Sequence, residues 1–173
     1  GEKKLALAGS SAFLVFVNGS FLAFGPARAG HGYYRVDEYD LGELLTSDEN
    51  TVEIRMFGYN VQSFEYVDLP SFLCAEITCG DDVIAYTSEG DTGFACFSFD
   101  ERMTRVQRYS FQRMFVENYK LCNDYLNYSS RDELKVEATE PKHFICRDIP
   151  YGNYNRIAPA SIMGQGSVGY SEK

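Results

Sequence analysis

The chain has 173 residues and a mass of 19.6 kDa, which fits one domain with a sizeable core, or one domain with a tail. Its 16 Lys and Arg against 25 Asp and Glu give a net charge of −9. That balance argues against binding to nucleic acid or to an anionic membrane surface, because both are recognised through clustered cations. A hydrophobic content of 45% and a charged content of 24% exclude disorder. Aromatic residues make up 15%, with no Trp, and favour β structure.

The N-terminal apolar stretch predicts strands. Two lysines precede it, as in a signal peptide, but Gly9, Ser10 and Ser11 interrupt it and it leads directly into a hairpin. It is also shorter than the roughly 20 apolar residues that span a bilayer. Because the chain starts with Gly rather than Met, we expect it to be an excised piece of a longer protein.

The next elements are predicted from turn signals and alternation. Asn18-Gly19 supplies the two positive φ angles of a type I′ turn and predicts a tight hairpin of strands 13–17 and 20–24. A loop over 25–32 precedes a strand over 33–39. Asp40 is placed to cap a single helical turn whose leucines, Leu41, Leu44 and Leu45, fill the core. A strand over 51–57 alternates apolar and charged residues.

The second half is less regular. Further strands are predicted at 72–78, 83–87, 95–99, 134–138 and 143–147, with a hairpin turn at 80–82, while residues 100–125 fit a strand or a helix. Short strands between Gly and Asn turns, without long helices, indicate an all-β fold, an antiparallel β-sandwich. We expect this domain to span residues 1–150, and 151–173, which carry several Gly, to form an exit linker or the start of the next domain.

The cysteines do not indicate a metal site or a disulfide framework. They form no CxxC pair, their number is odd, and several lie inside apolar runs: Cys74, Cys79, Cys96, Cys122 and Cys146. We predict buried free thiols, which weakly favour a reducing, cytoplasmic compartment.

Two segments carry a resemblance to a known family. GPARAGHGYYRVDEYDL (25–41), following the VNG turn, and DERMTRVQRYSFQRMFVENYKL (100–121) resemble the N-terminal accessory domain of bacterial α-L-rhamnosidases. The resemblance covers residues from about 5 to 150. It implies a jelly roll of the galactose-binding-like type. In that family an inverting hydrolysis is carried out by two carboxylates in a separate (α/α) barrel further along the polypeptide.

The resemblance therefore implies a fragment that is not itself catalytic, and no acidic pair here stands out as a catalytic one. The implied partners are the catalytic barrel of the same polypeptide and rhamnose-containing glycans. Related modules bind rhamnose through calcium, using acidic and amide ligands soon after the hairpin turn. Residues 22–25 are Leu-Ala-Phe-Gly, without an acid or amide, which makes calcium doubtful; we predict no cofactor and no metal, with calcium as the open alternative.

Three sets of residues are candidates for saccharide binding or interdomain contact. The first is the loop and strand with Arg28, His31, Tyr34 and Arg35, since Tyr offers a flat face and Arg planar donors to sugar hydroxyls. Because Tyr33 and Tyr34 alternate, one of them belongs to the core. Arg28 could equally order its own loop.

The second set is Asn60 and Gln62, whose amides suit hydroxyl pairs but commonly serve turn geometry. The third is a basic run interleaved with aromatic residues, which we expect to stack on them and to pair with acids, or to dock on the barrel: Arg102, Arg105, Arg108 and Arg113, with Tyr109, Phe111 and Phe115.

The sequence thus favours a non-catalytic accessory domain that supports a glycosidase barrel and helps recognise rhamnosylated glycans. The alternatives are an independent carbohydrate-binding module and a purely structural interdomain scaffold. A self-contained enzyme would turn over a chromogenic rhamnoside, and we expect no such turnover.

Overall fold

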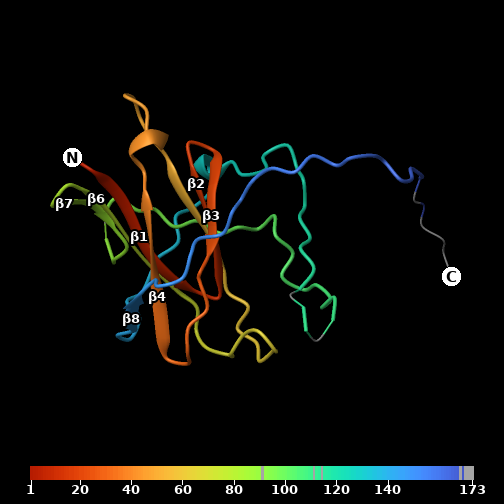
Figure 1. Ribbon diagram of the computed structural model, residues 1–173, viewed down its shortest axis with the longest axis horizontal. Helices are drawn as coiled ribbons and strands as arrows, with labels where there is room; N and C mark the ends of the chain where they lie inside the picture. The colour runs from red at the N-terminus through yellow and green to blue at the C-terminus, as the bar shows by residue number, and fades with distance from the viewer. Residues whose placement is uncertain (91, 111, 114, 168, 170–173) are drawn as a thin grey trace.

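The computed structural model describes residues 1–90, 92–110, 112–113, 115–167 and 169, and shows a sandwich of two β-sheets (Figure 1). One sheet has the strand order β7-β6-β1-β4-β8 and the other the order β3-β2-β5. The strands are β1 (Lys3–Ser10), β2 (Ala12–Val17), β3 (Ser20–Gly25), β4 (Tyr33–Asp40), β5 (Val52–Phe57), β6 (Phe72–Cys79), β7 (Asp82–Tyr86) and β8 (His143–Cys146). All pairings are antiparallel except β4 with β8. The predicted all-β sandwich is confirmed.

The core lies between the two sheets and is filled by the central strands. Leu5 and Leu7 of β1 are fully buried, and they belong to one cluster with Phe13 and Val15 of β2. Successive side chains of a strand point to opposite faces, so this spacing of two turns one apolar face of each strand inward. The N-terminal apolar stretch is therefore two strands, as predicted.

The predicted turns are present. Asn18 and Gly19 have φ angles of 50° and 75°, as a type I′ turn requires, and Gly80 has a φ of 64° between β6 and β7. The single helical turn is a 3₁₀ helix, η1 (Gly42–Leu44), and Asp40 Oδ1 accepts a hydrogen bond from the Gly42 N–H at 2.8 Å. Leu41 is fully buried, whereas Leu44 is 39% exposed, so the leucines fill the core only in part.

Two predicted strands, 95–99 and 134–138, are wrong. Both ranges lie in a long connection between β7 and β8, whose described part contains a second 3₁₀ turn, η2 (Tyr128–Ser130), and otherwise only isolated bridges. Their backbones meet at one hydrogen bond, from Leu134 N–H to the Cys96 carbonyl at 2.7 Å. In 95–99 the aromatic side chains favoured a strand, but Phe99 packs on Phe57 without strand pairing, at 6.2 Å between ring centroids. In 134–138 apolar and charged residues alternate without a partner strand in the described part of the chain.

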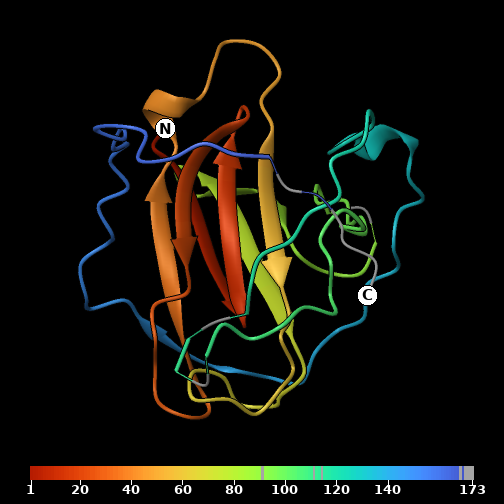
Figure 2. The ribbon, with the colours of Figure 1, turned by 90° about the vertical axis from the view of Figure 1, so that its right-hand side faces the viewer.

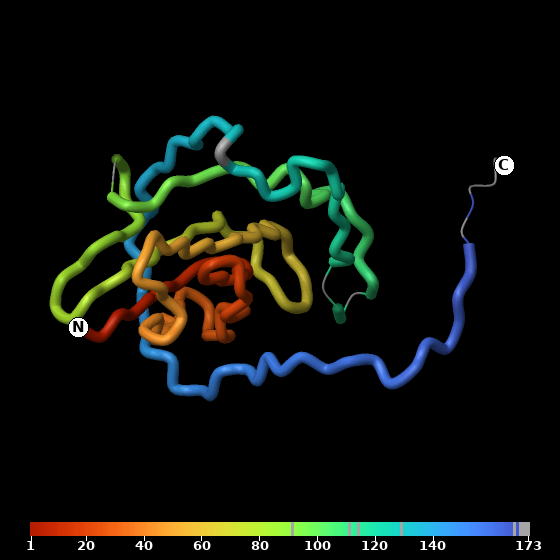
Figure 3. Tube along the Cα trace, turned by 90° about the horizontal axis from the view of Figure 1, so that it is seen from above, coloured from red at the N-terminus to blue at the C-terminus, as the bar shows by residue number. Residues whose placement is uncertain are grey.

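The connection covers one side of the sandwich. Figure 3 shows residues 88–142, green to light blue, running along one side of the hairpins, with the C-terminal segment on the opposite side. The described residues of 100–125 form neither predicted alternative, since among them only the isolated bridges of Arg102 with Tyr119 and of Arg108 with Phe115 have strand character. Phe111 lies outside the described residues.

The cysteines correct another expectation. All five carry free thiols, but Cys74, Cys96, Cys122 and Cys146 are exposed and Cys79 is half-buried. On β6, Cys74 takes an outward position, since buried Ala75 follows it, and Cys146 is exposed at the end of β8. Cys79 lies on the face of β6 that Ala75 turns inward and is half-buried at the end of the strand.

A buried ion pair fastens β8 and the following segment to the sandwich. Asp37 on β4 is fully buried, and its Oδ1 accepts a hydrogen bond from Arg147 at 2.9 Å. Its Oδ2 accepts one from the Tyr39 hydroxyl at 3.2 Å. Burial, followed by the neighbouring Asp37 carboxylate, raises the pKa of Tyr39, so this hydroxyl stays protonated and donates.

Residues beyond Pro150 continue across the sandwich before they leave it. The Tyr151 hydroxyl bonds both the N–H and the carbonyl of Glu38 at 2.8 Å, and the Tyr154 hydroxyl donates to the Phe24 carbonyl at 2.9 Å. The segment therefore contacts β4 in one sheet and β3 in the other, then extends away from the body (Figure 1). Within the described part of the chain, no helix is long and apolar enough to cross a membrane.

Candidate functional site at one end of the sandwich

Three loops meet at the end of the sandwich where β4 begins and β5 ends. Figure 2 shows the loops over 26–32 and 58–71 together below the strands. An ion pair joins them, with Arg28 Nη2 3.0 Å from Glu65 Oε1. The third loop, around 105–113, reaches the same end and lines a depression with Glu65. The structure thus brings residues from all three candidate sets to one place.

The two arginines of the first set have different environments. Arg28 is 76% exposed along its side chain and pairs with Glu65. Arg35 is largely buried, donates from Nε to the Arg28 carbonyl at 2.8 Å and pairs with Asp148. Arg35 therefore orders the loop that presents Arg28, while Arg28 is available at the surface.

The aromatic residues of this set divide as their alternation requires. Tyr34 is half-buried, and its ring stands perpendicular to Phe72 with centroids 4.6 Å apart. Tyr33 is 54% exposed and lies 5.9 Å from His143 between ring centroids. His31 lies exposed on the turn before β4. Of the two tyrosines, Tyr33 is thus the one that presents a surface.

Asn60 and Gln62 lie on the second loop. Asn60 adopts a left-handed φ of 44°, and its Oδ1 accepts a hydrogen bond from the Ser71 hydroxyl, which ties the two ends of the loop together. Gln62 is exposed. Tyr59, between β5 and this pair, stacks on Tyr66 of its own loop at 4.8 Å.

Three of the four arginines of the basic run, Arg102, Arg108 and Arg113, lie over aromatic rings, as predicted for the run. The guanidinium of Arg102 lies 4.3 Å from the centroid of Phe57, and that of Arg108 lies 5.2 Å from Phe115. Phe115 in turn stacks on Tyr59 at 5.5 Å between centroids. These contacts fasten the third loop to the second, since cation–π and stacked pairs hold rings and guanidinium groups in fixed planes.

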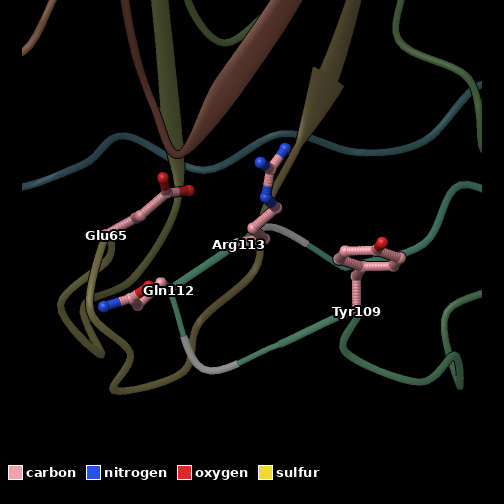
Figure 4. Close-up of a pocket in the computed structure, with 4 residues that line it drawn as sticks. All are labelled: Glu65, Tyr109, Gln112 and Arg113. Carbon is pink, nitrogen blue, oxygen red and sulfur yellow. The ribbon is translucent and has the colours of Figure 1, made fainter.

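The depression between these loops has a volume of about 690 Å³. Among the described residues it is lined by Glu65, Tyr109, Gln112 and Arg113 (Figure 4). Tyr109 is 76% exposed, and the Arg113 guanidinium lies 5.9 Å from its ring centroid. Figure 4 shows Glu65 on the second loop and the other three side chains on the third.

The lining combines an exposed aromatic face, a guanidinium, a carboxylate and an amide. Such groups suit a ligand with apolar C–H faces and several hydroxyls. The sequence interpretation included Tyr109 and Arg113 but missed Glu65 and Gln112. The basic run, which contains Gln112, pointed to the third loop, whereas only the folded structure brings Glu65 beside that loop.

The described residues do not form a metal centre. They contain no group of three or more His, Cys, Asp or Glu side chains that could hold a metal ion. Leu22 packs against the core and Ala23 is buried, so residues 22–25 place apolar groups where calcium would need oxygen donors. The chain at this position does not fit calcium.

Comparison with known proteins gives a structural likeness only. No family model matches the sequence, and no curated protein shows significant sequence similarity to it. The fold is similar to the crystal structure of a GH78 family rhamnosidase of Bacillus sp. GL1, with a TM-score of 0.65 and 23% sequence identity. The similarity covers 87% of this chain and 17% of the rhamnosidase. This chain thus has the fold of one domain-sized part of that rhamnosidase.

Proposed function

We propose that this chain is a non-catalytic accessory domain of an α-L-rhamnosidase-like glycoside hydrolase. The observation that carries the proposal is the extent of the structural similarity, which covers 87% of this chain but only 17% of the rhamnosidase. The domain supports the catalytic (α/α) barrel of the same polypeptide and is of the N-terminal jelly-roll type that the sequence resembles.

The state of the carboxylates supports a non-catalytic role. In the described part of the chain, the buried acids are Asp37 and Glu101. Asp37 pairs with Arg147, and Glu101 pairs with Arg131. An inverting hydrolase needs two carboxyl groups that face a sugar and a water. Carboxylates neutralised by arginines in the interior serve stability instead.

The segment after the sandwich supports an interdomain contact. Ile157, Ile162 and Met163 are 92%, 83% and 94% exposed on the extending segment. Apolar side chains exposed together mark a surface that another chain segment or domain covers. We assign that role to the barrel of the same polypeptide.

The test uses the parent reading frame. We expect it to encode a helical barrel beyond this domain, and deleting residues 1–150 from the parent should lower the melting temperature of the barrel. The isolated chain should not hydrolyse a chromogenic rhamnoside. A parent without a helical barrel, or turnover by the isolated chain, would contradict the proposal.

The depression at the loop end favours a second function, saccharide recognition by the domain itself. Tyr109 supplies the exposed ring, and Arg28 and Arg113 supply planar donors at the same end. In this alternative the chain is an independent carbohydrate-binding module for rhamnose-containing glycans.

Titration of the chain with rhamnose and rhamnosylated glycans, with and without calcium, separates these functions. Saturable binding that is lost in Tyr109→Ala and Arg28→Ala would favour recognition. Tyr86→Ala is the matched control, because Tyr86 is exposed on the distant edge strand β7. An absence of binding to every sugar through the millimolar range would favour the scaffold role over saccharide recognition.

A further inference from the structure

A second depression shares no lining residue with the first and includes Arg102 and Arg105 of the third candidate set. It has a volume of about 300 Å³ and lies along residues 99–105 and beside Lys120. The charged groups in its lining are Arg102, Arg105, Lys120 and Asp100, and Phe99 and Thr104 contribute a ring and a hydroxyl. Three cations against one anion give the lining an excess of two positive charges.

The backbone brings these cations together from two segments. Arg102 and Tyr119 form an antiparallel bridge, and the Met103 N–H donates to the Asn118 carbonyl at 2.8 Å. The Lys120 N–H donates to the Glu101 carbonyl, also at 2.8 Å. This two-segment pairing fixes the backbones of Arg102 and Lys120 side by side, so their proximity is built into the fold.

The positive charge of the lining is incompletely neutralised. The Asp100 carboxylate accepts a hydrogen bond from the Ser98 hydroxyl at 2.8 Å. The Glu117 carboxylate forms a long ion pair with Arg102 Nη2 at 4.0 Å, so the cations of the lining without an ion pair among the described residues are Arg105 and Lys120. Glu101 is directed to Arg131 instead. In a chain of net charge −9, a local cationic excess of this kind needs an explanation.

Arg102 is held in place mainly by rings. Its side chain is 13% exposed, and its guanidinium lies 4.3 Å from the Phe57 centroid and 5.3 Å from that of Tyr59. Nη2 donates to the Tyr59 hydroxyl at 2.8 Å, while the buried Nε–H has no hydrogen-bond partner among the described residues. Stacking fixes the guanidinium plane, and Glu117 at 4.0 Å neutralises part of its charge.

We propose that this depression binds an oxyanion, the carboxylate or sulfate group of an acidic saccharide. A planar guanidinium fixed in advance, with Arg105 and Lys120 at the rim, suits charge-assisted hydrogen bonds to such a group. The volume is at the lower limit for ligand pockets, the size of a single sugar unit. The choice of a saccharide as carrier rests on the proposed function, whereas the oxyanion chemistry rests on the lining alone.

The test is calorimetric titration of the whole chain at low ionic strength with matched pairs of probes. Digalacturonate is compared with its methyl ester, which lacks the charge, and a sulfated galactose is compared with galactose and with inorganic sulfate. We expect one or both acidic sugars to bind in the millimolar range or tighter, the uncharged partners not to bind, and salt to weaken the binding. Which acidic sugar binds identifies the oxyanion.

Variants at the rim locate the site without disturbing the stacked Arg102. Arg105→Gln with Lys120→Gln should weaken binding about tenfold, since two charge-assisted contacts are lost. Lys4→Gln with Arg156→Gln makes the same change in net charge at exposed positions outside the lining and should change affinity less than about twofold.

Three outcomes would overturn the proposal. These are equal binding of digalacturonate and its ester, equal binding by the rim and control variants, and an absence of binding by every acidic probe. Equal affinity for inorganic sulfate and the sulfated sugar would overturn only the saccharide assignment. None of these outcomes depends on whether the parent contains a barrel, so failure here is distinct from failure of the proposed function.

Discussion

Replacing Arg147 by Met should destabilise the domain strongly, because it leaves the buried Asp37 carboxylate without its counter-ion. The Asp37 carboxylate is buried, and among the described residues it is hydrogen-bonded only to Arg147 and Tyr39, so nothing else compensates its charge when Arg147 is replaced. Met keeps the volume of the aliphatic stem but removes the guanidinium. Removing one partner of a buried pair costs about 3–5 kcal/mol, because the other charge stays buried and uncompensated.

Further contacts of Arg147 add to this effect. Its Nε donates to the Ile149 carbonyl at 2.9 Å, its Nη2 donates to the Pro150 carbonyl at 2.7 Å, and its guanidinium lies 4.1 Å from the Tyr151 ring centroid. We therefore also expect faster hydrogen exchange at Glu38, whose N–H donates to the Tyr151 hydroxyl.

Equilibrium urea unfolding of a double-mutant cycle measures the magnitude. Arg147→Met, Asp37→Asn and the double variant are compared. The free energy of unfolding of the double variant should fall by less than the sum of the two single decreases, because neither buried charge remains without its partner. Arg156→Met, at an exposed position, should change the free energy of unfolding by no more than about 0.5 kcal/mol. A loss below about 1 kcal/mol for Arg147→Met, or strict additivity in the cycle, would refute the reasoning.

Three further predictions concern other parts of the domain. Gly25→Ala should lower stability by about 1–3 kcal/mol or more, because a Cβ there would lie 2.3 Å from the Phe13 ring and 2.7 Å from the Asp37 carboxylate; Gly30→Ala, with nothing within 4 Å, should be nearly neutral, and equal melting temperatures would contradict this. The hydrogen bond from Arg131 holds the pKa of Glu101 in the folded chain below the usual 4.5. The contribution of Glu101 to the free energy of unfolding is therefore complete above pH 4.5 and is lost as the pH falls through that lower pKa. The stability difference between wild type and Glu101→Gln should therefore shrink in acid, unlike that for exposed Glu140→Gln, and a difference that does not vary with pH would be evidence against the pair. A thiol reagent should modify exposed Cys74 and Cys146 of the native chain faster than half-buried Cys79. Exposed Cys96 and Cys122 should also react slowly, because partial burial raises the pKa of the Cys96 thiol and the hydrogen bond with Asp124 raises that of Cys122; protection of all five until unfolding would show that the thiols are buried.

Local signals predicted most of the sandwich. The Asn18-Gly19 turn needs only its own backbone angles, and the alternation in 33–39 and 51–57 needs only two faces of different polarity. The strand at 95–99 was wrong because aromatic content was taken as strand pairing. The strand at 134–138 was wrong because its alternation of apolar and charged residues has no partner strand among the described residues. Phe99 packs on Phe57 of β5 and Phe97 on Tyr128 of η2, and these tertiary contacts are contained in no local window.

The sequence predicted which kinds of residue form the candidate site, but not which residues contact one another in it. The sequence pointed to Arg28 and to the basic run, and both reach the same end of the sandwich. It could not show that Arg28 would meet Glu65, 37 residues away, or that Tyr34 would turn toward Phe72. It also missed Lys120, whose place beside Arg102 depends on a bridge between two segments without regular structure.

The parallel pairing of β4 with β8 has a consequence for the order of assembly. Asp37 and Arg147 are 110 residues apart, and closing a loop of that length costs about 4 kcal/mol of chain entropy. Apart from the pairing of β4 with β8, the strands up to β7 pair among themselves, β2 with β3 and β6 with β7 as hairpins and β1 with β4 and β6 over longer separations. They can therefore form before β8 arrives. During synthesis on the ribosome, β4 is therefore an open sheet edge with Asp37 still hydrated, and the emergence of residues 143–154 closes that edge, supplies the counter-ion and completes the fold in one late step.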